Sequence, residues 1–277
     1  MNFRFVLRAF ILSLALLALA VVGLALLPQP TLRQIILWVV TRPPAPTPRP
    51  PIITAPRGPL PEGAAGLQEW GQYQGEAYMP RGSGFLLKLN DGTIVGLITA
   101  HSVDLGNPAH LLERLAFTLP GQSDFIAESD TLYGLPGLPD PSADAFNMVM
   151  DWVLLKTDDP VNEALALTAD PRGAPQPGER VLLFSGLSDG AGGPRALAGT
   201  VQAVDEFGAW MLMDDTFNAG GMSGSPIVSE HTGQVVGMTM AVIARRDRLL
   251  IGFHPIGHLV ELAESATEFP KLAEYRR

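Results

Sequence analysis

Beyond Glu62 the chain is built from short apolar runs interrupted by Gly, Pro, Asn and Asp, and this texture restricts the folds open to it. Two runs, Phe85–Leu89 and Ile94–Thr99, flank Asn90-Asp91-Gly92, a turn sequence typical of a β-hairpin. Further strands are expected at Trp152–Lys156, Val181–Phe184, Thr200–Val204, Trp210–Met213, Pro226–Ser229, Val235–Val242 and Leu249–Phe253. A helical pattern is convincing at Gly257–Phe269. Many short strands and one late helix predict an all-β barrel or sandwich.

Composition narrows the classes of function. Residues 62–277 carry 13 Lys or Arg against all 28 Asp and Glu, a net charge of −15, so this part of the chain repels phosphate backbones and we expect no nucleic-acid partner. The sequence has no cysteine, which excludes a disulfide scaffold, a thiol nucleophile and a Cys-based zinc site. With 47% hydrophobic residues the chain has enough apolar material for a sizeable core.

The N-terminus predicts a membrane segment. Residues 9–27 carry no charge and, as a helix rising ~1.5 Å per residue, would reach about 28 Å, close to the ~30 Å hydrocarbon core of a bilayer. The short segment 1–8 before it is basic. The length of the apolar run favours an uncleaved signal anchor over a cleaved signal peptide. Because Arg33 and Arg42 flank its other end, the distribution of charge does not decide the orientation of this segment. Long domains cross a membrane largely regardless of such charges, and we expect the domain on the extracytoplasmic side of a bacterial-type cell membrane.

Residues 28–62 are expected to form a linker. From Pro43 to Pro61, proline occurs at nearly every second or third position. Proline removes a backbone donor and fixes φ, so this stretch predicts a semi-extended spacer between the membrane and the domain. A polyproline ligand for an adaptor domain is the alternative.

Three residue types needed for acyl transfer occur once each in a distinctive setting. His101 follows a strand, Asp151 opens an apolar strand, and Ser223 lies in a glycine-rich turn before another strand. A serine hydroxyl becomes nucleophilic when an imidazole takes its proton, and a buried carboxylate orients that imidazole. Each segment alone has a structural explanation, such as a tight turn or an anion nest around the serine. Together, on strand ends of an all-β chain, they indicate acyl transfer, with Asp144 as the rival acid.

Other chemistries fit less well. An α/β-hydrolase elbow needs a helix after the serine turn and a histidine late in the chain, whereas Pro226 begins a strand and His101 comes first. His254 and His258 are four residues apart, but Pro255 and Gly257 interrupt the helix that a zinc pair would need. We therefore expect neither a metal nor a cofactor.

Five motifs carry a family resemblance, which covers about residues 78–262. They are Gly82-Ser83-Gly84-Phe85 with Thr99-Ala100-His101, Asp151–Lys156, Gly221–Pro226, Gln234–Met238 and Gly252–Pro255. With these motifs the sequence resembles the chymotrypsin-like (trypsin-fold) serine peptidases, especially their bacterial HtrA/Deg-like and glutamyl-endopeptidase-like branches, without a PDZ domain.

The resemblance implies a fold and a set of roles. His101 would be the general base, Asp151 its orienting acid and Ser223 the nucleophile, with the amides of Gly221 and Ser223 as the oxyanion hole. The peptidase domain would span residues 63–277, with six-stranded antiparallel barrels at about 63–170 and 178–257 and a C-terminal helix at about 257–269.

The resemblance also bears on activation and specificity. Met222 stands where secreted digestive enzymes have an aspartate that pairs with a new amino terminus, so activation by cleavage is not expected. The primary substrate pocket would be lined by uncharged residues, which favour a small or medium aliphatic side chain before the scissile bond. These residues are Phe217, Thr239, Met240 and Ala241. His254 is the competing feature, because a histidine near the pocket would favour an acidic side chain.

Together these features predict a membrane-anchored serine endopeptidase that acts on proteins or peptides. A catalytically silent trypsin-fold protein that binds peptides or a partner protein at the cell surface is the alternative. An esterase with the same nucleophile is a third possibility. The sequence does not define an oligomeric state.

Overall fold

The structure is a computed structural model, and it describes residues 48–63, 65–139, 150–158, 160–187, 195–205, 208–245 and 248–276. The expected membrane helix at 9–27 and the rival acid Asp144 lie outside these residues. Among the residues described, no helix is both long and apolar enough to cross a bilayer.

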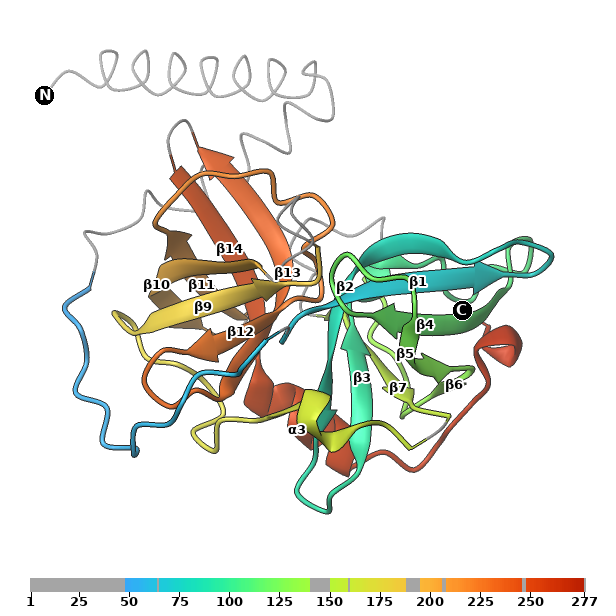
Figure 1. Ribbon diagram of the computed structural model, residues 1–277, viewed down its shortest axis with the longest axis horizontal. Coiled ribbons are helices and arrows are strands. Elements are labelled where there is room, and N and C mark those ends of the chain that lie inside the picture. Colours follow the sequence, from blue (N-terminus) through green and yellow to red (C-terminus); the bar gives the residue numbers. More distant parts are fainter. Residues whose placement is uncertain are drawn as a thin grey trace, which may run out of the picture. The chain divides into compact units, whose positions relative to one another are not determined.

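The first half of the domain is an antiparallel sheet that curls into a nearly closed barrel (Figure 1). Its strands are β1 (Leu67–Tyr73), β2 (Met79–Lys88), β3 (Ile94–Ile98), β4 (Leu112–Thr118), β5 (Phe125–Ser129), β6 (Thr131–Leu132), β7 (Val153–Lys156) and β8 (Ala166–Thr168). They follow the order β5-β4-β1-β2-β3-β7-β6, and β8 pairs with β2 in parallel. The expectation of six antiparallel strands is therefore wrong for this half, where the described residues form eight.

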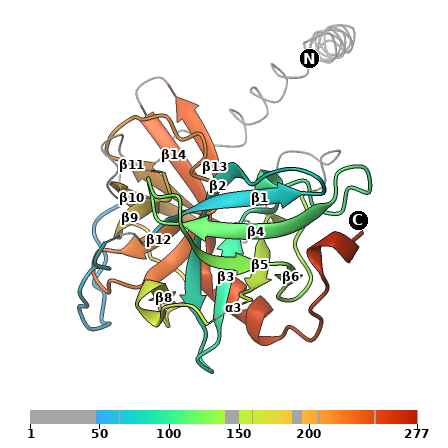
Figure 2. The same ribbon diagram turned by 45° about the vertical axis from the view of Figure 1, so that its right-hand side comes forward.

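The second half is a closed barrel of six strands in the order β10-β11-β14-β13-β12-β9, as expected. The strands are β9 (Arg180–Ser185), β10 (Arg195–Asp205), β11 (Gly208–Met213), β12 (Pro226–Ser229), β13 (Val235–Arg245) and β14 (Arg248–Pro255). The prediction of an all-β domain with two barrels is thus confirmed. Figure 2 shows the two sheets from a second direction, with the first barrel in front.

The predicted hairpin around Asp91 is confirmed. β2 and β3 pair from Phe85 opposite Leu97 to Lys88 opposite Ile94. Gly92 has a φ of 91°, a conformation in which a side chain is disfavoured, and its amide donates to the Leu89 carbonyl at 3.0 Å. This turn sends β3 back along β2 and so delivers the chain to His101.

One apolar cluster spans the two barrels. The cluster includes Phe85, Leu97 and Trp152 from the first barrel and Phe184, Val228 and Met238 from the second, together with Ile256 and Leu259 of helix α3 (Ile256–Glu264). Burial of apolar surface on both sides of the seam therefore opposes separation of the barrels.

Helix α3 is shorter than the expected 257–269. It ends at Glu264, after which the Gly134 amide donates to the Glu268 carbonyl and the Leu132 amide to the Pro270 carbonyl. Pro270 also disfavours a helical conformation for the residue before it. The chain after α3 therefore runs beside the first barrel instead of continuing the helix.

The proline-rich segment is not a free spacer over residues 48–62. The Gly58 amide donates to the His231 carbonyl at 3.0 Å, and His231 Nε2 lies 2.7 Å from the Ala55 carbonyl oxygen. At Gly233 a side chain would meet the Pro59 carbonyl oxygen at 1.8 Å, so the segment lies tightly against this turn. The segment, blue in Figure 1, packs along the second barrel. The described part of the expected linker therefore lies against the second barrel.

Candidate active site

Three side chains expected to act together lie in one line of hydrogen bonds. His101 lies on a short 3₁₀ turn (η1, Ala100–Ser102) after β3, Asp151 precedes β7, and Ser223 lies in the turn before β12. His101 Nδ1 is 2.6 Å from Asp151 Oδ2, and His101 Nε2 is 2.9 Å from Ser223 Oγ. Both distances are within the range needed for proton transfer between a base and its partner.

Asp151 is completely buried, and both of its carboxylate oxygens face His101. Oδ1 accepts a hydrogen bond from the His101 backbone amide at 2.9 Å, while Oδ2 faces the imidazole. The same carboxylate thus holds both the backbone and the ring of His101. With Nδ1–H donated to the carboxylate, Nε2 is left as the acceptor for the Ser223 proton.

Two consecutive tight turns present Ser223. The Met222 amide donates to the Ala219 carbonyl at 3.2 Å, and the Ser225 amide donates to the Met222 carbonyl at 3.0 Å. Gly221 and Gly224 have φ values of 79° and 86°, which glycine adopts without strain. At Gly224 a Cβ would also lie 2.0 Å from the Ser83 carbonyl oxygen, so no other residue fits there.

The amides expected to form the oxyanion hole are free to bind a ligand. Within the described part of the chain, neither the Gly221 amide nor the Ser223 amide donates a hydrogen bond to protein. Gly221 is exposed and Ser223 is half-buried, so both groups border the solvent. Free N–H groups beside a nucleophile can stabilise the oxyanion of a tetrahedral intermediate.

His254 has a different place from the one expected. It is 2% exposed, and its Nε2 lies 3.2 Å from the backbone carbonyl oxygen of Asp151. Burial lowers the pKa of His254 to about 4, so the ring is neutral near pH 7 and Nε2–H donates to that carbonyl. A buried imidazole cannot pair with an acidic substrate side chain, so His254 in this conformation supports Asp151 instead.

Two of the four expected pocket residues are partly accessible. Phe217 and Ala241 are half-buried, whereas Thr239 and Met240 are buried. One neighbour was not expected from the sequence: the guanidinium of Arg195 lies 5.3 Å from the centre of the Phe217 ring. No sequence motif marks Arg195, because the contact depends on how β10 passes the loop before Ser223.

Met222 shows how the nucleophile turn is anchored. Its side chain is 1% exposed and belongs to the core of the second barrel, where Phe217, Ala219 and Leu187 pack around the same cluster. Burial of an apolar side chain therefore stabilises this turn at the position where the secreted digestive enzymes have an aspartate that pairs with a new amino terminus.

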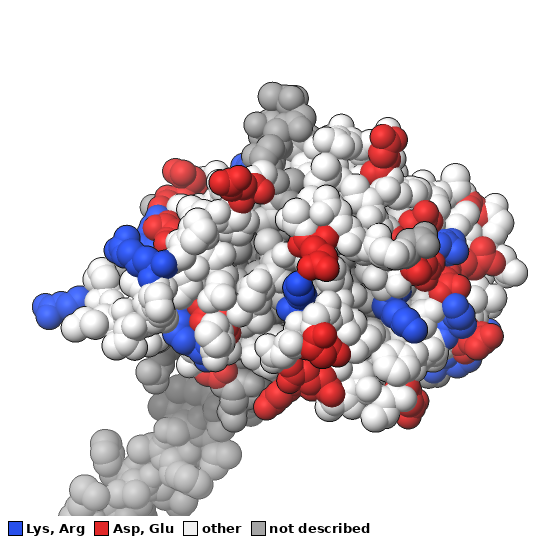
Figure 3. Space-filling model, turned by 60° about the horizontal axis from the view of Figure 1, so that its bottom comes forward, with Lys and Arg blue, Asp and Glu red and all other residues white. Residues whose placement is uncertain are grey.

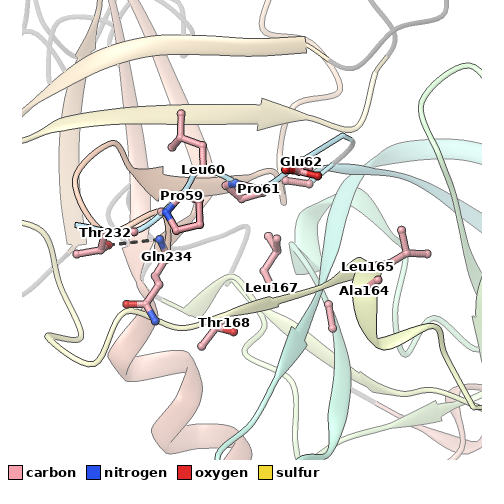
Figure 4. A pocket seen from close by; sticks show the side chains of 14 residues that line it. Pro59, Leu60, Pro61, Glu62, Ala164, Leu165, Leu167, Thr168, Thr232 and Gln234 are labelled. Atoms are coloured by element: carbon pink, nitrogen blue, oxygen red, sulfur yellow. Dashed lines mark hydrogen bonds between the residues drawn. The ribbon is translucent and has the colours of Figure 1, made fainter. Parts of the chain in front are cut away.

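A groove of about 430 Å³ lies away from these residues (Figure 4). It is lined by residues 58–62, 65, 164–168 and 232–234, none of them in the hydrogen-bonded line. On the face shown in Figure 3, acidic and basic side chains are interspersed without a broad patch of one sign. The described residues contain no group of three or more His, Asp or Glu that could hold a metal ion.

A buried carboxyl group lies beside Ser102, the residue after His101, and was not expected from the sequence. Glu69 of β1 is completely buried, and its Oε2 lies 2.9 Å from the hydroxyl of Ser102. The same hydroxyl lies 2.8 Å from the Thr99 carbonyl. One hydroxyl proton cannot satisfy both acceptors, so a protonated Glu69 completes the chain from carboxyl to hydroxyl to carbonyl. Burial accordingly raises the pKa of Glu69 to about 8.

Comparison with known proteins agrees with the motifs. The sequence matches the model of the trypsin-like peptidase domain over residues 82–238. No curated protein matches the chain by sequence. This family match confirms the resemblance seen in the sequence.

Solved structures with a similar fold have little sequence in common with the chain. A thermostable serine protease from an extremophilic microorganism is 10% identical with a TM-score of 0.51, covering 74% of this chain and 98% of that one. The HtrA-type protease AlgW with a decapeptide is 16% identical with a TM-score of 0.48, covering 74% of this chain and 65% of that one. Kallikrein-related peptidase 10 is 14% identical with a TM-score of 0.49, covering 74% and 95%. The chain therefore spans just under two thirds of the HtrA-type protein.

The protonated Glu69 predicts a pH dependence of stability. Between pH 4.5 and about 8 the folded chain keeps this proton and the unfolded chain does not, so stability falls as pH rises, by up to about 1.4 kcal/mol per pH unit. In Glu69→Gln, which keeps a donor for Ser102, this slope should disappear from denaturant unfolding measured between pH 5 and 8.

Glu163→Gln is the matched control. Glu163 is exposed, and its hydrogen bond with Lys88 lowers its pKa, so its titration affects stability only below pH 4.5. An unchanged slope in Glu69→Gln would show that Glu69 is ionised in the folded chain.

Proposed function

The chain belongs to the trypsin-like peptidase family, and from this membership we propose that it is a serine endopeptidase that hydrolyses internal peptide bonds with His101, Asp151 and Ser223. The observation that carries the proposal is the unbroken hydrogen-bonded line from the buried Asp151 carboxylate through His101 to the Ser223 hydroxyl. Each pair of neighbours in this line lies at the distance that its role requires.

The reaction follows from this geometry. As Ser223 Oγ bonds to the peptide carbonyl carbon, His101 Nε2 takes its proton and the carbonyl electron pair moves onto oxygen. The amides of Gly221 and Ser223 would stabilise this oxyanion. Collapse breaks the C–N bond, the imidazolium gives its proton to the departing amine, and an acyl-enzyme remains. Water, deprotonated by the same imidazole, then releases the second product and restores the Ser223 hydroxyl.

The site is proposed to be competent without cleavage of the chain. The nucleophile turn is held by burial of Met222 and by hydrogen bonds to neighbouring strands. The residue before Ser223 is the apolar Met222, so this position has no carboxylate that could pair with a new amino terminus. These contacts support a peptidase whose active site forms without proteolytic activation.

Substitution of the three residues tests the proposal. Ser223→Ala and His101→Ala should each lower kcat for peptide hydrolysis by about five to six orders of magnitude, and their losses should not add because the residues act as a unit. Asp151→Asn should lower kcat by about 10⁴, because an amide favours the wrong imidazole tautomer. Near-full activity of Asp151→Asn together with loss of activity in Asp144→Asn would move the role of the acid to Asp144.

A fluorophosphonate probe separates the enzyme from a silent binding protein. The purified protein should be labelled, and Ser223→Ala should not be. No Ser223-dependent labelling of the folded wild-type protein would favour the alternative of a peptide-binding or partner-binding protein. Ester turnover without any peptide cleavage would favour an esterase.

The proposed substrate preference is a small or medium aliphatic residue before the scissile bond. The four pocket residues carry no charge, so a buried Lys or Arg of the substrate would be left without a partner there, which is costly. An acidic residue is the second candidate, supported by the guanidinium of Arg195 beside Phe217 and no longer by His254.

Cleavage of a peptide library should therefore be dominated by Val, Ala, Leu or Ile before the cleaved bond. Dominant cleavage after Glu or Asp that is lost in Arg195→Ala would support the acidic alternative. Dominant cleavage after Lys or Arg would contradict both.

We also propose that the domain is anchored to a cell membrane by residues 9–27 and lies on its extracytoplasmic side. The support is the uncharged run of 19 residues behind two arginines. The full-length protein should stay with membranes after carbonate extraction. Protease added to the extracytoplasmic side of the intact cell membrane should digest the domain. Release by carbonate, or protection of the domain from that protease, would contradict the proposal.

A further inference from the structure

Ser83 of β2 makes three hydrogen bonds to the second barrel although it belongs to the first. Its side chain is fully buried. Its backbone amide donates to the Ser223 carbonyl at 3.0 Å, and its hydroxyl donates to the Gly221 carbonyl at 2.8 Å. The hydroxyl also accepts from the Gly186 amide at 3.2 Å. One proton and one lone pair of this hydroxyl are therefore both used.

These bonds fall on the backbone that separates the two oxyanion amides. The peptide plane between Gly221 and Met222 lies directly between the amide of Gly221 and the amide of Ser223. Its carbonyl is held by the Ser83 hydroxyl, and its N–H is held by the Ala219 carbonyl at 3.2 Å. Because a peptide group is planar and rotates as one unit, two bonds on opposite sides fix its orientation.

The two planes that follow are held by backbone groups. The carbonyl of Met222 accepts from the Ser225 amide at 3.0 Å. The plane after Ser223 is held by the Ser83 amide at its carbonyl and by the Thr239 carbonyl, which accepts from the Gly224 amide at 2.7 Å. Among the described residues, the Ser83 hydroxyl is thus the side-chain group that holds the plane between Gly221 and Met222.

The turn needs such a tie because it begins with two glycines. Gly220 and Gly221 have no Cβ to restrict rotation, and Gly221 already has a positive φ. Both lie at the solvent border, where a released carbonyl can turn toward water. Rotation of the plane between Gly221 and Met222 changes ψ of Gly221 and φ of Met222, which are torsion angles that lie between the two oxyanion amides.

We propose that Ser83 is a positioning residue, whose hydroxyl keeps the Gly221 and Ser223 amides converged on the oxyanion. This inference rests on the proposed peptidase function and adds a residue to which that function assigns no role. Ser83→Ala leaves the backbone bond to Ser223 in place and removes only the bonds of the hydroxyl. The nucleophile and the base are therefore kept, and the loss falls on the oxyanion site.

The test compares substrate turnover with binding of a transition-state analogue by the full-length protein in detergent. Loss of one oxyanion donor lowers kcat by about 10²–10³, and misorientation of part of the population costs less. In Ser83→Ala we expect kcat to fall about 10- to 100-fold with KM within about twofold. A peptide trifluoromethyl ketone forms a tetrahedral adduct that carries an oxyanion, so its Ki should rise by the same factor as kcat/KM falls.

Ser129→Ala is the matched control. Ser129 of β5 is also a buried serine, and its hydroxyl lies 2.8 Å from the Thr131 carbonyl and 2.6 Å from the Lys156 carbonyl. None of these groups belongs to the candidate site. Ser129→Ala should lower the Tm about as much as Ser83→Ala does and leave kcat and the Ki of the ketone unchanged. Where Ser83→Ala does not fold, Ser83→Cys, which keeps a weak donor of similar size, takes its place in both measurements.

Each outcome decides the matter. A parallel loss in kcat/KM and ketone affinity, absent from Ser129→Ala, supports the proposal. Unchanged kcat and Ki in a Ser83 variant of an active wild-type protein overturn the positioning role alone and leave the peptidase function intact. A wild-type protein without hydrolysis or probe labelling overturns the proposed function and this inference with it.

Discussion

Hydrogen bonds across the seam between the two barrels are the interactions on which the candidate site depends. His101 and Asp151 come from the first barrel and Ser223 from the second, so no single barrel holds a complete line. The seam is bonded from both sides: Ser83 reaches the nucleophile turn, and His254 of β14 reaches the Asp151 carbonyl. A shift of one barrel against the other would therefore disturb the His101–Ser223 distance together with the bonds made by Ser83 and His254.

Burial makes these bonds costly to break. Ser83 and Asp151 are completely buried and His254 is 2% exposed, and an unpaired polar group in such surroundings costs about 1–3 kcal/mol or more. Separation of the barrels would also expose the apolar cluster that they share with α3. Polar complementarity therefore sets the relative position of the barrels, while apolar burial supplies the force that keeps them together.

Much of the fold was predictable from the sequence. The parts that were not expected include β1, β4, β5, β6 and β8, the end of α3 and the packing of residues 48–62. Strands of the second barrel have apolar runs that show as strands directly. β1 was not expected, because its buried face carries Glu69 between Leu67 and Tyr73, and a buried carboxyl hides the apolar alternation. The end of α3 and the packing of residues 48–62 were missed because both depend on partners distant in sequence, at Gly134 and at His231.

By itself the sequence determined the residue types for acyl transfer, their order along the chain and the glycines that shape the nucleophile turn. It also determined that the residue before Ser223 is apolar, because the identity of a chain neighbour is read directly from the sequence. Only the tertiary structure decided that His254 bonds to the backbone carbonyl of Asp151 and that the Ser83 hydroxyl bonds to the Gly221 carbonyl in the nucleophile turn. The partners in these two hydrogen bonds are separated by 103 and 138 positions along the chain. Such bonds form only when both barrels are folded and docked, so no local sequence pattern predicts them.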